Sequence, residues 1–208
     1  MFTWIFALVL ILVLFIHEFG HFLAMAFLGY KKKGILFAPP FGAVAYGAKK
    51  DETDKEKVTV LMAGPLPGII IGLALFFLGG AFLQNDLNKA VGFTFIFINS
   101  INLLPISPLE CGRIIDSVFL HKSKIAQLVL AGLGQIFLVI YAIISQSILI
   151  IIMTFFFAVA LWARIKDFQG NKDKEVYKES NLTLLARIVA GMLYVSLVSI
   201  AVVFFLIY

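Results

Sequence analysis

The residues best suited to chemistry are two histidines and a glutamate inside a long apolar stretch. They form the run His17-Glu18-Phe19-Gly20-His21, and no other ionisable side chain occurs between Thr3 and Gly29. Residues four apart share one face of a helix, so both imidazoles can reach one metal ion, and Glu18 beside them can accept a proton from a bound water. Because ionisable groups are costly in hydrocarbon, this placement indicates a hydrolytic metal site within a membrane.

The composition independently predicts an integral membrane protein. Of the 208 residues, 62% are hydrophobic, and 22 of them are Phe. A soluble domain of this length cannot bury so much apolar surface, whereas helices of ~20 residues can place it against lipid and against one another. The single cysteine excludes a disulfide framework within the chain, and the lysines form no basic patch with interleaved aromatics. Nucleic acid is therefore not expected as a partner.

Apolar segments predict about six membrane spans, the first of which contains the histidines. These spans cover about 2–28, 58–83, 91–109, 125–143, 147–163 and 183–207. Between Gly34 and Gly47, Gly and Pro punctuate short β-prone runs, which indicates either a small membrane-associated β-hairpin or an amphipathic interfacial loop. We expect an all-α polytopic membrane protein forming a single domain over 1–208. Its catalytic core would cover about 1–120, followed by additional helices over about 121–208.

The distribution of basic residues predicts which loops share one side of the membrane. With alternating spans, the stretches 29–57, 113–124 and 164–182 lie on the same side, and they hold 15 of the 17 Lys and Arg residues. Basic loops are retained in the cytoplasm. We therefore expect these loops to be cytoplasmic and both termini to lie on the opposite side, as in a multi-pass protein of the cell membrane.

A second motif, at residues 102–113, supplies candidates for a third metal ligand. Its two prolines prevent a continuous helix, and irregular backbone at membrane depth is tolerated where it lines a water-containing cavity. Glu110 can complete a His-His-Glu set, an arrangement known for catalytic zinc with one position left for water. Alternatively, Glu110 pairs with Arg113 at the membrane edge. Cys111 is either a thiolate ligand or a small buried residue.

These two motifs resemble those of the site-2 protease family of intramembrane zinc metalloproteases. The family's HExxH corresponds to His17 to His21, and its N-x-x-P-x-x-x-L-D-G corresponds to the run from Asn102 to Gly112. Glu110 stands in place of the family's aspartate, and Cys111 in place of the first following glycine. The resemblance implies Zn2+ as cofactor, held by the two histidines and Glu110, with Glu18 as general base.

The resemblance extends to smaller features between and within these motifs. It implies that Asn102 holds substrate or the developing oxyanion, whereas we expect Asn99 to serve packing. The segment Ala63 to Gly68 resembles the family's AGPxxN, with Gly68 where the family often has asparagine. Glycines at positions 64, 68 and 72 repeat every four residues, so we expect them to let a neighbouring helix approach closely.

The activity implied by the resemblance is regulated intramembrane proteolysis. The substrate would be a membrane-tethered protein whose transmembrane helix is destabilised by Pro or Gly. The lipid bilayer would surround the protein, and a regulatory membrane partner is possible. Two other classes stay open. The altered Glu110-Cys111 pair favours a catalytically impaired homologue that binds membrane partners, although Glu18, which metal binding does not need, argues against it. A metal or proton transporter is less favoured because the chain shows no internal repeat.

Overall fold

The chain forms helices around one small sheet. The computed structural model describes residues 3–37, 43–83, 86–105, 109–120, 123–146 and 148–170. The described residues group into two compact units, the first ending at Leu103 and the second beginning at Leu104. The single-domain organisation expected for the chain stays a prediction. The predicted span at 183–207 lies outside the described residues.

Helix α1, Thr3–Phe27, carries the first motif. Its 25 residues extend for ~38 Å at ~1.5 Å per residue, which exceeds the ~30 Å hydrocarbon core of a bilayer. Val13, His17, His21 and Met25 are buried and recur every four residues, so one face of the helix is directed into the protein. The helix ends at Phe27, and Gly29, with a positive φ of 75°, turns the chain into the sheet.

Two antiparallel strands follow α1: β1, Lys31–Phe37, and β2, Ala43–Ala48. Ile35 pairs with Ala45, and the register is irregular near Lys31, where Lys32 has a φ of 48°. A side chain at Gly34 would collide with the ring of Tyr46, which crosses this position. Of the two structures predicted for this segment, the β-hairpin is therefore the one that forms.

Helices α2, Asp54–Ala63, α3, Pro65–Leu83, and α4, Asp86–Ile101, complete the first unit. Helix α2 begins with a capping box, in which the side chains of Thr53 and Glu56 each bind the other's backbone N–H. Gly64 separates α2 from α3. The proline that opens α3 lacks an N–H and so interrupts the helical hydrogen bonding at this junction.

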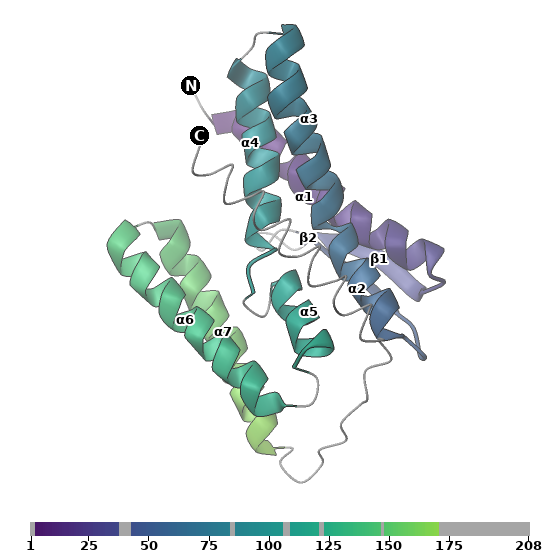
Figure 1. The fold of residues 1–208 in the computed structure, drawn as a ribbon, viewed down its shortest axis with the longest axis vertical. Coiled ribbons are helices and arrows are strands. Elements are labelled where there is room, and N and C mark those ends of the chain that lie inside the picture. Colours follow the sequence, from purple (N-terminus) through teal and green to yellow (C-terminus); the bar gives the residue numbers. More distant parts are fainter. Residues whose placement is uncertain are drawn as a thin grey trace. The chain divides into compact units, whose positions relative to one another are not determined.

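Helices α3 and α4 lie side by side (Figure 1). A Cβ atom on Gly72 would lie 2.8 Å from the carbonyl oxygen of Gly92, and one on Gly92 would lie 2.7 Å from that of Gly72. The two backbones are therefore in contact, with Phe76 and Ile96 buried beside them. This contact confirms the predicted close helix approach at the glycine repeat.

Lys49 connects the polar ends of α1 and α2. Its ammonium group donates to the carbonyl of Leu28, at 2.7 Å, and to the carboxylate of Glu56, at 2.5 Å. It also lies 5.7 Å from the centre of the Tyr30 ring. Burial, together with a hydrogen bond to Glu52, raises the pKa of the Tyr30 hydroxyl, which therefore stays a donor at neutral pH.

The second unit contains α5, Glu110–Val118, α6, Lys124–Ser145, and α7, Ile148–Gly170. Helices α6 and α7 form an antiparallel hairpin (Figure 1), and the side chain of Gln135 donates to the carbonyl of Thr154 across it, at 3.1 Å. Arg164 on α7 pairs with Asp116 on α5 at 2.6 Å. Polar contacts of this kind hold apolar helices together where lipid surrounds them.

Three helical segments in the described residues are long and apolar enough to cross a membrane: Trp4–Phe27, Asp54–Leu78 and Lys124–Ile144. A shorter apolar helix covers Leu87–Ile101.

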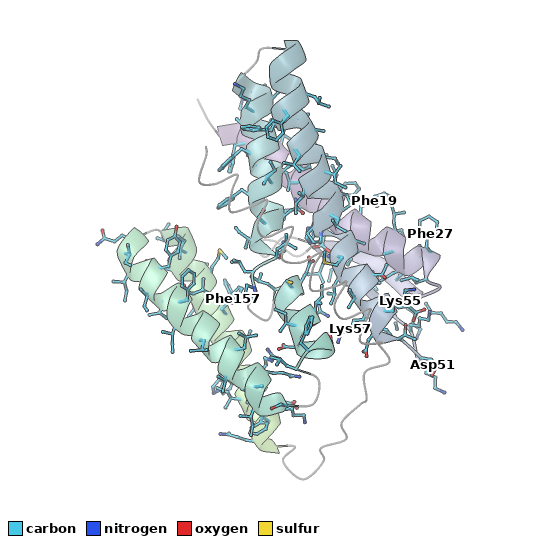
Figure 2. All side chains as sticks on the ribbon, in the orientation of Figure 1. Phe19, Phe27, Asp51, Lys55, Lys57 and Phe157 are labelled. Carbon is cyan, nitrogen blue, oxygen red and sulfur yellow. The ribbon has the colours of Figure 1, made fainter. Side chains whose placement is uncertain are left out.

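Figure 2 shows Phe19 and Phe27 projecting outward from α1, while Asp51, Lys55 and Lys57 gather at the start of α2. These features confirm the helical membrane fold with its small hairpin. The number of six spans stays a prediction.

Candidate metal centre

Helix α1 brings the two predicted histidine ligands together. His17 and His21 are 4% and 8% exposed, and their Nε2 atoms lie 3.2 Å apart. This arrangement follows from the four-residue spacing, which stacks the two side chains on successive turns of one helix face. The two Nε2 atoms thus lie close together, as the spacing predicted, and their role as metal ligands stays a prediction.

Each histidine is oriented through its other ring nitrogen. The Nδ1 atom of His17 lies 2.8 Å from Oδ1 of Asn99 on α4, and Nδ1 of His21 lies 2.7 Å from the carbonyl oxygen of Val60 on α2. The Asn99 amide nitrogen donates to the carbonyl of Phe95, at 2.8 Å, which assigns its oxygen to the imidazole. Both partners are acceptors, so both Nδ1 atoms carry the proton of a neutral ring.

Zinc fits this donor set. With a proton on each Nδ1, both Nε2 atoms can offer a lone pair to one ion placed between them, and they lie 3.2 Å apart. Two nitrogens each ~2.0–2.1 Å from one tetrahedral zinc ion lie ~3.3 Å apart. The Nε2 spacing is therefore close to that of two ligands on the same ion.

Gly64, at the junction of α2 and α3, lies directly against these side chains. A Cβ atom on Gly64 would lie 2.3 Å from Nε2 of His21 and 3.0 Å from Nε2 of His17. One on Gly20 would lie 2.0 Å from the carbonyl oxygen of Ala63, so the backbones of α1 and α2 also touch. The sequence predicted close helix packing here. It did not reveal that the packed surface includes the Nε2 atoms of both histidines.

Glu18, the predicted general base, is held by the hairpin. Its Oε2 atom accepts a hydrogen bond from the backbone N–H of Ala45 on β2, at 2.6 Å. The carboxylate is half-buried and lies one residue after His17 on α1. The sequence predicted a strand near the site, and its direct hydrogen bond to the base is a finding of the structure.

Asn99 contributes more than the packing expected of it. The side chain is completely buried and binds His17 directly. The signal in the sequence was an amide in the mostly apolar second half of α4, a pattern that also fits ordinary contacts between helices. Val60 gave no signal, because only its backbone takes part.

The second motif begins in the first unit and continues in the second. Asn102 follows α4, and its amide donates to the carbonyl of Ile98 at 3.4 Å. Glu110 is the first residue of α5, a position at which the helix dipole favours a carboxylate, and the neighbouring Cys111 is buried. The roles of Asn102, Glu110 and Cys111 stay predictions.

The fold and the site define a helical membrane protein with two buried, closely spaced histidines on one apolar helix. The chain belongs to peptidase family M50, whose family model matches residues 5–208. This membership confirms the recognition made from the two motifs.

Individual relatives agree with this assignment. The chain is 30% identical over 167 residues to a zinc metalloprotease of Methanocaldococcus jannaschii, covering 73% of this chain and 48% of the relative. It is 32% identical over 114 residues to stage IV sporulation protein FB of Bacillus subtilis, covering 54% and 39% respectively. The chain thus spans less than half the length of these relatives.

A solved structure shares the fold. The site-2 protease from Methanocaldococcus jannaschii matches with a TM-score of 0.58 at 20% identity. The match covers 85% of this chain and 80% of that structure.

Replacing Gly64 with alanine should prevent zinc binding without unfolding the protein. The new methyl group would lie 2.3 Å from His21 Nε2, within the space that a zinc ion ~2.0–2.1 Å from that nitrogen requires. Zinc per purified protein, measured by mass spectrometry, should fall close to zero. Gly132→Ala is the control, because its added Cβ meets no atom within 4 Å and should leave zinc content unchanged. Stoichiometric zinc in Gly64→Ala would contradict the site.

Proposed function

We propose that the chain is an intramembrane zinc metalloprotease that hydrolyses a peptide bond in or near a transmembrane segment of a membrane-tethered substrate. The observation that carries this proposal is the Nε2 pair at 3.2 Å, with both Nδ1 atoms bound to acceptors. Glu18 follows His17 in the chain, and its carboxylate is held by the Ala45 N–H. Membership of family M50 supports it, as does the relative named a zinc metalloprotease.

We propose His17, His21 and Glu110 as the zinc ligands. Two imidazoles and one carboxylate leave a fourth position open, as catalytic zinc requires. In support of Glu110, it occupies the aspartate position of the second motif, and it begins α5 rather than lying within a continuous helix. Glutamate carries the same carboxylate as aspartate on a side chain that is one methylene longer.

Glu18 acts as the general base in this proposal. Bound zinc supplies Lewis-acid chemistry, which acidifies a water molecule and polarises the scissile carbonyl. The Glu18 carboxylate accepts the proton of the attacking water and passes it to the leaving amine. The hydrogen bond from Ala45 N–H to Oε2 holds the carboxylate in place for both transfers.

The substrate must be unwound before it is cut. A peptide bond in an intact helix is shielded and its carbonyl is engaged, so segments destabilised by Pro or Gly are the expected substrates. The hairpin supports this proposal, because β2 lies directly beside Glu18 and an extended substrate can pair with an exposed strand. Asn102 is proposed to hold substrate or the developing oxyanion, and a regulatory membrane partner is compatible with the same fold.

We propose that the basic loops face the cytoplasm and that both termini lie on the opposite side. Cysteines introduced at positions 49, 122 and 174 should react with an impermeant reagent from the cytoplasmic side, and one at position 85 from the other side. The reason is the lopsided distribution of Lys and Arg. Reaction of positions 122 and 174 from opposite sides would overturn the six-span arrangement.

Glu18→Gln should give a folded protein that binds zinc and does not cleave. The amide keeps the size of the side chain but cannot accept the water proton, whereas both imidazoles remain. Cleavage of a helical membrane reporter should fall by at least ~100-fold, in line with the usual contribution of a general base. Zinc content, measured on the same sample, should be unchanged. Activity within a few-fold of the native protein would exclude this role and leave a binding protein or a transporter to be tested.

The third ligand can be identified by comparing three substitutions. If Glu110 binds zinc, Glu110→Gln should lose most zinc and nearly all cleavage, Glu110→Asp should keep measurable activity, and Cys111→Gly should be tolerated. A thiolate ligand predicts the reverse, with zinc lost in Cys111→Gly. If Glu110 only pairs with Arg113, an exposed pair worth at most ~1 kcal/mol, zinc content should not change. Zinc per protein beside cleavage rate distinguishes these patterns.

A further inference from the structure

We propose that Asn99 is a positioning residue that fixes the tautomer and ring orientation of His17, and that Gly68 provides the space that keeps the Asn99 amide in place. The inference rests on the proposed metal centre. It concerns a residue outside both sequence motifs. It also assigns a role to a glycine whose position in the sequence suggested only helix packing.

The Asn99 amide is held at both of its polar atoms. Its Oδ1 lies 2.8 Å from Nδ1 of His17, and its Nδ2 donates to the carbonyl of Phe95, one turn earlier on α4, also at 2.8 Å. A flipped amide would place Nδ2 against the imidazole and Oδ1 against a carbonyl oxygen, losing the hydrogen bond to Phe95. The amide therefore has one favoured orientation, which requires a proton on His17 Nδ1 and leaves Nε2 for the metal.

Gly68 on α3 closes the space around this amide. A Cβ atom at that position would lie 2.1 Å from Nδ2, 2.5 Å from Cγ and 2.7 Å from Oδ1 of Asn99. The α3 backbone is thus packed against the amide, and Asn99 itself is completely buried. Because any larger residue at position 68 would displace the amide, the glycine and the asparagine work as a pair.

The two histidines differ in how their orientation can be changed. His21 is bound by the backbone carbonyl of Val60, which no substitution removes. His17 is bound by a side chain, so mutation can test this half of the pair. Partners of this kind typically change metal affinity by ~10–100-fold when they are lost.

Four variants test the pairing through zinc affinity, measured by competition with a chelator. Asn99→Ala removes the acceptor and should weaken zinc binding by ~10–100-fold. Asn99→Asp keeps an oxygen facing Nδ1 but places its other oxygen against the Phe95 carbonyl, so it should recover part of that affinity. Gly68→Ala retains Asn99 but displaces its amide, so it should also weaken zinc binding. Gly132→Ala is the control, since its added Cβ meets no atom within 4 Å and should leave zinc affinity unchanged.

A second readout does not require metal. In the zinc-free protein, labelled with 15N in its histidines, the ring nitrogen shifts of His17 report which nitrogen carries the proton. The native protein, Asn99→Asp and Gly132→Ala should show the Nδ1–H form, whereas Asn99→Ala and Gly68→Ala should show a mixture of both forms. Loss of thermal stability without this change would indicate a purely structural role for Asn99.

The inference is overturned if Asn99→Ala keeps native zinc affinity and native His17 shifts. Gly68→Ala gives an independent answer if Asn99→Ala does not fold. Neither readout uses proteolysis, so a protein without protease activity would contradict the proposed function while leaving the role of Asn99 to be decided on its own evidence.

Discussion

The site depends on contact between the backbone at the α2–α3 junction and the histidine-bearing face of α1. Gly20 touches the Ala63 carbonyl, and Gly64 lies against both imidazole rings. This close packing lets the carbonyl of Val60 on α2 bind His21. It also lets the amide of Asn99 on α4 bind His17. One additional methyl group at the junction would separate the helices by more than these hydrogen bonds tolerate. The orientation of the imidazoles is therefore a property of helix packing.

This dependence links metal binding to the stability of the first unit. Lipid surrounds membrane helices with apolar groups, so burial of apolar surface contributes little to their association. The imidazoles are oriented from α2 and α4, and an ion bound between them stabilises the packing that orients them. Ligands that bind only the folded state raise its stability in proportion to their affinity and concentration. Zinc would accordingly act on the helices as well as on the reaction.

The sequence indicated which residues could carry out chemistry at this site. It did not indicate which residues orient them. His17, Glu18 and His21 were recognisable because their spacing on one helix determines their geometry. The hairpin was one of two alternatives, since strand pairing depends on long-range contacts that local composition does not specify. The part played by Asn99 could not be predicted, because it depends on α4 packing beside α1. The hydrogen bond from His21 to the Val60 carbonyl could not be predicted either, because every residue has a backbone carbonyl. For Glu110, the proposed third ligand, spacing along the chain says little about its distance from the histidines, because the two prolines that precede it rule out one continuous helix from α4.

The hydrogen bond between Glu18 and the Ala45 backbone bears on how such a protein can change over time. A backbone N–H is supplied by every residue except proline, so the base keeps its partner whichever side chain occupies position 45. The exposed side chains of the hairpin, among them Leu36 and Val44, take no part in this hydrogen bond. If Glu18 is the base and β2 receives substrate, as proposed, selectivity at this strand and the placement of the base are encoded separately. A lineage with such a site could then acquire new target proteins by altering the hairpin surface while the geometry of proton transfer stayed the same.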